Sequence, residues 1–215
     1  MFIIKNMLEN YTKLENGVIK QDVVNIIEYT KEYIVDSYNS YGELGCRMGN
    51  LRLGYLIGSL GKVPNSILDV GYGNGDFLKV CSSIIPKCYG NDISGYETPA
   101  GVEFVENITK DFYDVITFFD VLEHFEDISF VKDLKCDYVF ISVPWCHYNS
   151  DEWFESWKHR RPNEHLYHFD KESLECFMKE QGFEVVNTSN LEDSIRKPVD
   201  ENKNILSAIF KKTQK

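Results

Sequence analysis

The 215-residue sequence has no long hydrophobic run, no closely paired cysteines and no excess of positive charge. Its apolar stretches stay well below the roughly 18 residues that a membrane-spanning helix needs. The six cysteines never form a C-x-x-C pair and the first residues do not make a cleavable hydrophobic leader, so we expect reduced thiols and a cytoplasmic location. The formal net charge of −11 disfavours nucleic acid and anionic membranes as partners.

The composition is that of a globular domain, with 43% hydrophobic and 27% charged residues. The chain is long enough to bury the core of a sheet of about five to seven strands, whereas two full domains would be cramped. Apolar side chains recur with helical spacing between residues 22 and 60, and residues 61–65 interrupt that pattern. We therefore predict an N-terminal helical cap over residues 1–60 and one main domain over residues 61–215.

Strand-like and helix-like segments alternate from residue 66 onward. The predicted strands span residues 66–70, 88–93, 114–119, 138–143, 183–188 and 205–211, and the predicted helices span residues 76–85 and 171–181. This alternation favours βαβ units and a mostly parallel sheet. The polar residues 192–204, between the last two strands, are expected to form an exposed loop.

The most informative segment is a glycine-rich turn, Asp69-Val70-Gly71-Tyr72-Gly73-Asn74-Gly75, which follows a strand and opens a helix. Glycines in such a turn let the backbone approach a ligand closely and present helix N-terminal amides to it. A dinucleotide-binding fingerprint needs a glycine where this chain has Asp76, and a Walker loop needs Lys followed by Ser or Thr, so neither pattern fits. The acidic residue before the turn favours a cationic ligand.

Three further segments follow the glycine turn. They are Asn91-Asp92-Ile93-Ser94, the stretch from Asp114 to Phe125, and Glu164-His165-Leu166 followed by Glu180-Gln181-Gly182-Phe183. With Asp69-x-Gly71-x-Gly73-x-Gly75, they resemble the motifs of the Rossmann-like (class I) S-adenosylmethionine-dependent methyltransferases, in their small-molecule and glycan branch. The resemblance implies an α/β three-layer Rossmann-like fold with a seven-stranded, mostly parallel sheet whose last strand is antiparallel. It also implies an enzyme that transfers the methyl group of S-adenosylmethionine.

The same resemblance implies roles for individual residues. The glycine turn wraps the methionine part of the cofactor, Asp69 faces its ammonium group, and Asp92 holds its ribose. The implied cofactor-binding residues are Asp69, Gly71, Tyr72, Gly73, Gly75, Asp92, Ile93, Asn107, Ile108, Phe119 and Asp120. Two other interpretations stay open, in which the glycines serve only tight packing of strand against helix and Asp92 is a helix N-cap.

A cluster of Asp120, Glu123 and His124 follows the strand predicted at 114–119. In the ubiquinone-type O-methyltransferases, a similar cluster can hold a divalent cation. The other interpretation is that Glu123 and His124 form an ordinary hydrogen-bonded structural pair, and we expect no metal here.

Residues 146–170 are predicted to be an insertion that covers the acceptor side of the site. Together with the two residues before it, this stretch holds all three tryptophans and four of the five histidines. Histidine suits a general base at neutral pH, so His147 is the first catalytic candidate and His165 the second. Structural histidines, a small satellite core under the tryptophans, and a solvated face at Arg160 and Arg161 are the other interpretations.

The predicted function is methyl transfer from S-adenosylmethionine to a small-molecule acceptor, with O-methylation of a sugar-like or other hydroxyl compound as the preferred reaction. The alternative is a non-catalytic module or partner subunit that binds S-adenosylmethionine or S-adenosylhomocysteine. A nucleic-acid methyltransferase is disfavoured by the charge and by the absence of an N/D-P-P-Y/F tetrad. The acceptor and the oligomeric state remain open.

Overall fold

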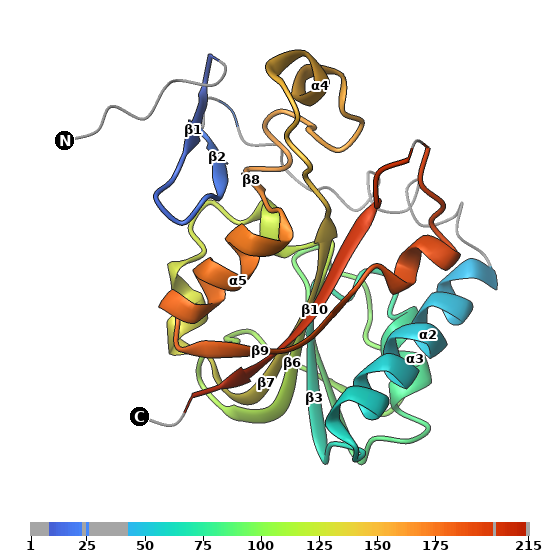
Figure 1. Cartoon of the computed structure of the whole chain (residues 1–215). Helices are drawn as coiled ribbons and strands as arrows, with labels where there is room; N and C mark the ends of the chain where they lie inside the picture. The colour runs from blue at the N-terminus through green and yellow to red at the C-terminus, as the bar shows by residue number, and fades with distance from the viewer. Residues whose placement is uncertain (1–8, 23–24, 26–42, 200, 214–215) are drawn as a thin grey trace.

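The computed structural model describes residues 9–22, 25, 43–199 and 201–213, and its centre is a seven-stranded sheet (Figure 1). Across the sheet, the strands are β5 (Val102–Phe104), β4 (Lys87–Asn91), β3 (Ser66–Val70), β6 (Phe112–Phe119), β7 (Lys135–Pro144), β10 (Ile205–Lys212) and β9 (Phe183–Ser189). Strand β10 is antiparallel to both of its neighbours, and the pairs among β5, β4, β3, β6 and β7 are all parallel. The predicted mostly parallel sheet with an antiparallel last strand is confirmed.

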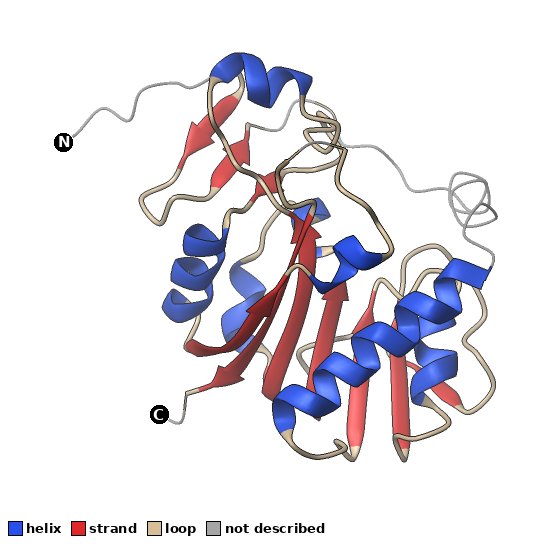
Figure 2. Cartoon of the chain, turned by 45° about the vertical axis from the view of Figure 1, so that its right-hand side comes forward, coloured by secondary structure: helices blue, strands red, loops and turns tan. Residues whose placement is uncertain are grey.

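Helices cover the two faces of this sheet and make three layers (Figure 2). Helices α2 (Glu43–Leu60) and α3 (Asp76–Cys81) pack on one face, and helix α5 (Lys171–Glu180) packs on the other. Because side chains alternate along a strand, Ile67 joins the core under α2 and α3 while Leu68 joins the core under α5. Strand β3 is therefore buried on both faces, as its short apolar run predicts.

Helix α5 begins and ends at residues that suit those positions. The Asp170 side chain accepts a hydrogen bond from the Ser173 backbone, and the Ser173 hydroxyl accepts one from the Asp170 backbone amide, which completes a capping box. The helix stops before Gly182, whose φ of 84° favours glycine. The predicted helix at 171–181 is confirmed, whereas the one predicted at 76–85 ends already at Cys81.

A small antiparallel sheet lies beyond the carboxyl end of β7. It consists of β1 (Tyr11–Lys13), β2 (Ile19–Gln21) and β8 (Tyr167–His168), and short helix α4 (Asp151–Ser156) packs beside it. Residues 11–21 are therefore a hairpin turning at Gly17, which has a φ of 89°, and not part of a helix. The helical part of the predicted cap is α2, and residues 1–8, 23–24 and 26–42 of it lie outside the described residues. The division into a cap and a main domain stays a prediction.

The segment expected as an exposed loop between β9 and β10 is instead partly buried. It starts with the 3-10 helix η3 (Leu191–Ser194), and Glu192 in that turn has an exposed fraction of 0%. The expectation of an exposed loop is wrong at Glu192, because Arg52 from α2 and Arg196 from the same loop pair with its charge.

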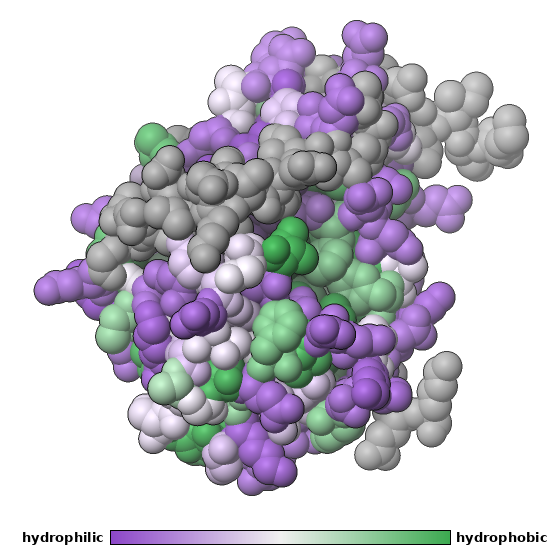
Figure 3. Space-filling model, turned by 180° about the vertical axis from the view of Figure 1, so that it is seen from behind, coloured by the Kyte–Doolittle hydropathy of each residue, from purple (hydrophilic) through white to green (hydrophobic). Residues whose placement is uncertain are grey.

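The face seen from behind relative to Figure 1 mixes hydrophilic and hydrophobic side chains over the described residues, with hydrophobic ones gathered near the middle of the view (Figure 3). Among the helices of the described residues, none combines the length and apolar character that a bilayer crossing demands.

Candidate functional site

One cavity of about 640 Å³ opens at the carboxyl ends of β3, β4, β6 and β7. We call its two parts the glycine end, made by Asp69, Gly71, Tyr72, Asn91 and Asp92, and the histidine end, made by His124, His159, Arg161, Glu164 and His165. Helix α2 contributes Gly45, Met48, Gly49 and Arg52 to a further wall. Ligands of open α/β sheets bind at this edge of the strands, so the cavity is the candidate functional site.

The glycine turn has the backbone that its glycines permit. Gly71, Gly73 and Gly75 have φ values of 72°, 55° and 76°, which L side chains rarely adopt. A Cβ atom on Gly71 would lie 2.3 Å from a methyl group of Val121, and one on Gly75 would lie 2.5 Å from Pro99. Gly71 lines the cavity, whereas Gly73 and Gly75 shape the turn behind it. The turn therefore packs tightly against neighbouring residues and also forms part of the cavity wall.

Asp92 closes the glycine end from the neighbouring strand. Its Oδ2 accepts a hydrogen bond from the Gly73 backbone at 2.8 Å and its Oδ1 accepts one from the Ser94 backbone at 2.7 Å. A carboxylate has about four lone-pair sites, so both oxygens keep acceptor capacity toward the cavity that Asp92 lines. No helix begins at Asp92, so the N-cap interpretation is excluded. Ile93 follows it on the rim with an exposed fraction of 79%.

Asp69 lies at the floor of the glycine end and is 3% exposed. The Thr117 hydroxyl donates a hydrogen bond to its Oδ1 at 2.6 Å. Burial raises the pKa of Asp69 to about 7, against the lowering effects of Thr117 and Arg52. A cationic ligand group beside this carboxyl would favour its ionised form.

Four charged side chains from three distant segments form an ion cluster beside the cavity, and they are Arg52, Asp120, Glu192 and Arg196. Arg52 binds Glu192 through Nε at 2.7 Å and Nη2 at 2.9 Å, while Arg196 Nη1 lies 2.6 Å from Asp120 Oδ2. Burial alone would raise the pKa of Asp120, but Arg196 and Arg52 outweigh it and lower that pKa to about 2. Asp120 is thus held by arginines. Only Asp120 of the four was a predicted site residue.

Phe119 and Tyr72 supply the aromatic part of the cavity wall. The guanidinium carbon of Arg52 lies 4.1 Å from the centre of the Phe119 ring, and Phe77 packs edge-on against the same ring. Tyr72 is 5% exposed, and its hydroxyl donates to the Tyr96 backbone. Both predicted residues line the cavity.

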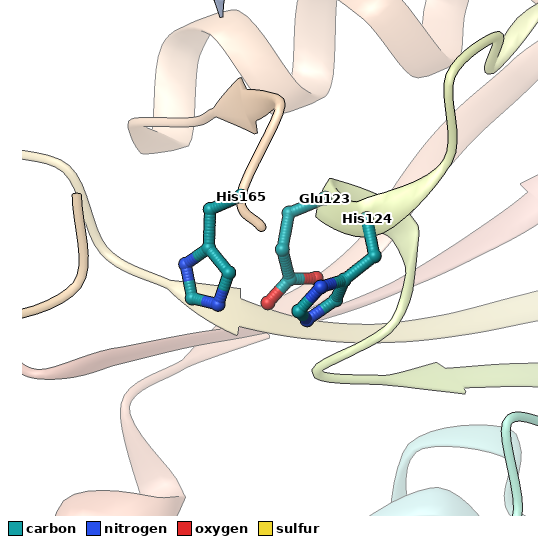
Figure 4. A group of neighbouring side chains, drawn as sticks. All are labelled: Glu123, His124 and His165. Atoms are coloured by element: carbon teal, nitrogen blue, oxygen red, sulfur yellow. The ribbon is translucent and has the colours of Figure 1, made fainter. Parts of the chain in front are cut away.

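Glu123, His124 and His165 converge at the histidine end (Figure 4). Glu123 and His124 lie in the 3-10 helix η1 (Leu122–His124) after β6, and His165 comes from the predicted insertion. Glu123 is 1% exposed, neither carboxylate oxygen has a hydrogen-bond partner among the described residues, and burial raises its pKa well above the ordinary value. Burial also lowers the pKa of His124, and it lowers that of His165 to about 2. The hydrogen-bonded pair of Glu123 and His124 that one interpretation expected is not formed through the carboxylate.

His147 lies away from this cavity. Its Nε2 is 2.8 Å from the Lys203 carbonyl oxygen, its ring stacks on Trp145, and it lines a separate surface depression. Its position near the end of β7 along the chain does not bring His147 to the cavity, and the residues just before it, Trp145 and Cys146, pair instead with Phe169. Of the two catalytic candidates, only His165 lines the cavity.

Two other groups of predicted residues also lie outside the cavity lining. Asn107 accepts hydrogen bonds from Thr109, and Ile108 packs on the main hydrophobic core. Trp153 and Trp157 pack with Tyr11 and Phe154 under α4, which is the satellite core that one interpretation of the tryptophans expected. The cavity side of the insertion is its second half, from His159 to His165.

Comparison with solved structures shows the same fold at low sequence identity. A chain from the complex of the Haloferax volcanii Trm112 methyltransferase activator with its methyltransferase matches with a TM-score of 0.61 and 12% identity, covering 89% of this chain and 100% of that one. The 1,6-didemethyltoxoflavin-N1-methyltransferase of Burkholderia thailandensis, with bound S-adenosylhomocysteine, has a TM-score of 0.57 and 15% identity, covering 95% and 100%. The magnesium protoporphyrin IX methyltransferase of Synechocystis PCC 6803, with bound SAH, matches with a TM-score of 0.54 and 14% identity, covering 80% of this chain and 88% of that one.

The family comparison is more direct. No curated protein matches the chain. A family model described as a methyltransferase domain matches residues 50–188, which is more than half of the chain and includes the glycine turn, Asp92, η1 and α5. This chain therefore belongs to the methyltransferase domain family and is an S-adenosylmethionine-dependent methyltransferase.

Proposed function

We propose that this methyltransferase acts on a small-molecule acceptor and methylates a hydroxyl oxygen of a sugar-like or other hydroxyl compound. The observation that carries the proposal is the continuity of the cavity, which joins the glycine end to a polar histidine end in about 640 Å³. That volume is within the range of about 300–1,000 Å³ typical of small-ligand sites. The acceptors named for two solved neighbours, 1,6-didemethyltoxoflavin and magnesium protoporphyrin IX, are also small molecules.

The cofactor belongs in the glycine end. The Gly71 backbone would lie against the methionine part, and the Asp69 carboxylate would attract the ammonium group. The remaining acceptor capacity of Asp92 suits the two ribose hydroxyls. Ile93, exposed on the rim, would contact the adenine. In this arrangement the sulfonium methyl group points toward η1 and the histidine end.

The acceptor belongs in the histidine end. His124, His159, Arg161, Glu164 and His165 offer several hydrogen-bonding groups to one small volume, which suits a compound with several hydroxyls. The tryptophans lie outside this volume, so stacking of a sugar ring on tryptophan is not part of the proposal.

Methyl transfer depends mainly on holding the acceptor oxygen in line with the methyl group of the cofactor. A lone pair of the acceptor oxygen attacks the methyl carbon, the carbon–sulfur bond breaks with its electrons going to sulfur, and the hydroxyl proton leaves to solvent water. We assign His165 to contact that hydroxyl, because of the two candidate histidines it lines the cavity and His147 does not. Its pKa of about 2 makes it a poor full base, so a hydrogen bond that orients the hydroxyl is the role that suits it.

The test is transfer of an isotope-labelled methyl group from S-adenosylmethionine to a panel of sugars, phenols and hydroxy acids. We expect incorporation that is stable to mild base, as an ether is, and that falls at least about tenfold in His165→Asn. The matched variant is His147→Asn, which should keep the wild-type rate. Labelling confined to amines or thiols would contradict O-methylation. Equal loss in the two variants would contradict the assigned acceptor position, and the absence of turnover with every hydroxyl compound would contradict the proposed acceptor class.

A further inference from the structure

Glu123 has an unusual environment for an acid. Its side chain is 1% exposed, and neither Oε1 nor Oε2 has a hydrogen-bond partner among the described residues. Leaving a buried carboxyl group without partners costs free energy, and buried acids are normally paired, hydrogen-bonded or bound to a metal. The Glu123 backbone carbonyl, by contrast, accepts a hydrogen bond from the Leu166 amide at 2.7 Å. The side chain alone therefore points to a ligand.

The groups nearest to that carboxylate are two imidazole rings. One ligand atom each of Glu123, His124 and His165 lies within 4.8 Å of the other two, and Figure 4 shows the carboxylate between the rings. Metal ions with bonds of about 2.0–2.2 Å hold their ligand atoms roughly 3–4 Å apart, so a closure of about 1 Å completes the set. Side-chain torsions alone can supply such a shift.

The backbone around the rings prepares them for coordination. His165 Nδ1 lies 2.8 Å from the His159 carbonyl oxygen, which fixes the proton on Nδ1 and turns the Nε2 lone pair to the cluster. The His124 ring hydrogen-bonds the backbone of Glu164, so a second imidazole is oriented by the same loop. Metal-binding histidines almost always donate their other N–H to a carbonyl or carboxylate in this way.

We propose that Glu123, His124 and His165 bind one divalent transition-metal ion in the wall of the cavity. This set differs from the cluster that the sequence suggests, because Asp120 is held by Arg196 and Arg52 while His165 arrives from a segment 42 positions beyond Glu123. Two imidazoles with one carboxylate favour zinc, iron, cobalt or nickel over magnesium or calcium, which prefer oxygen ligands.

Three protein ligands leave coordination positions open toward the cavity, which both His124 and His165 line. If the proposed function holds, the acceptor oxygen takes one open position and the ion lowers the pKa of its hydroxyl. The proton then leaves to solvent water, and the oxygen attacks the methyl carbon. The role of His165 becomes that of a metal ligand beside the hydroxyl. Metal binding by the three residues does not itself depend on the proposed function.

The test uses the purified full chain, stripped with a chelator and titrated with Co²⁺ while the visible absorption bands of the ion are recorded. We expect one equivalent to bind, to show bands of nitrogen coordination, and to be displaced by Zn²⁺ and not by Mg²⁺ at the same concentration. Glu123→Gln and His165→Gln should each weaken binding by at least about 10–100-fold. His147→Gln, which removes a surface histidine outside the cluster, should bind as the wild type does.

Circular dichroism and titration with S-adenosylhomocysteine accompany each protein, so misfolding of one variant leaves the wild type and the other variant as the test. The proposal is overturned if the folded wild type shows no nitrogen-coordinated cobalt, if both cluster variants bind as well as the wild type, or if His147→Gln abolishes binding. If the protein binds S-adenosylhomocysteine but not cobalt, the metal site is contradicted and the proposed function is not. If the protein binds cobalt but transfers no methyl group to any hydroxyl compound, the proposed function is contradicted and the metal site is not.

Discussion

The glycine end of the cavity is built from nearby parts of the sequence, whereas the ion cluster and the histidine end are assembled from distant ones. The bond between the Gly73 amide and Asp92 spans 19 positions, and the bonds between Arg52 and Glu192 span 140. The glycine end consists largely of backbone fixed by glycines. The ion cluster buries the charge of Glu192 against Arg52, which comes from the distant helix α2, and against the nearby Arg196. The glycine end should therefore tolerate little change in side-chain size, and the ion cluster should tolerate little change in charge.

The largest effect is expected from removing one charge of the ion cluster. Glu192→Gln leaves Arg52 and Arg196 without their buried partner, and breaking a buried ion pair from one side costs about 3–5 kcal/mol. Denaturant unfolding should show this loss. The control is Glu175→Gln, which breaks only the partly exposed pair with Lys171 and should cost less than about 0.5 kcal/mol. Similar losses in the two variants would mean that the ion cluster contributes no more than a surface pair.

A change of shape at the glycine end should come next. Gly71→Ala puts a Cβ 2.3 Å from Val121 at a φ of 72°, and the left-handed backbone and overpacking together cost about 2–4 kcal/mol. The affinity for S-adenosylhomocysteine should fall as well, because Gly71 lines the cavity. Calorimetric titration and thermal unfolding measure the two effects. Unchanged affinity in a folded variant would show that the turn serves packing alone.

Much of the glycine end and the sheet could be predicted because their signals are local. Ser66 to Val70 is apolar enough to indicate a buried strand, and the glycines after it indicate a turn with an unusual backbone. The burial of Glu192 could not be predicted this way, since a glutamate in a polar stretch indicates solvent exposure unless Arg52 is known to lie beside it. Both His147 and His165 are candidates because they are histidines of the predicted insertion, and nearness to a strand end along the chain favours His147, yet only His165 lines the cavity. Strands β1, β2 and β5 have three residues each, too few for a period-two pattern to be seen.

An intermediate effect is expected from pH at the glycine end. The pKa of Asp69 is about 7, and a cationic ligand group binds its ionised form, so affinity for S-adenosylhomocysteine should rise with pH and be roughly tenfold lower at about pH 6 than at about pH 8. The free energy of unfolding should change with pH in the opposite direction to the affinity. Because the folded pKa exceeds the ordinary value of 3.8, the contribution of Asp69 to the free energy of unfolding falls as pH rises from about 4 to about 7. The pH slope of the affinity should disappear in Asp69→Asn, and its persistence there would assign it to another group.

The smallest effect should come from a glycine that no close contact requires. Gly58 lies in α2, and among the described residues no atom outside its own stretch of helix lies within 4 Å of the place that a Cβ would take. Gly58→Ala should therefore stabilise the protein by about 0.5–1 kcal/mol through helix propensity. Affinity for S-adenosylhomocysteine should not change. Thermal unfolding measures the change in stability. If Gly58→Ala destabilises the protein, the expected difference between a glycine of this helix and the glycines of the turn is contradicted.

We propose the glycine end as the cofactor site, with Asp92 at the ribose, and the proposed position of the acceptor in the histidine end rests on this proposal. The most direct measurement is calorimetric titration of the wild type, Asp92→Ala and Glu103→Ala with S-adenosylmethionine and S-adenosylhomocysteine, where Glu103 is an exposed carboxylate on β5 outside the cavity. We expect micromolar binding of both compounds to the wild type and to Glu103→Ala, with a loss of at least about tenfold in Asp92→Ala. A folded wild type that binds neither compound, or an Asp92→Ala variant that binds as tightly as Glu103→Ala, would contradict the assignment.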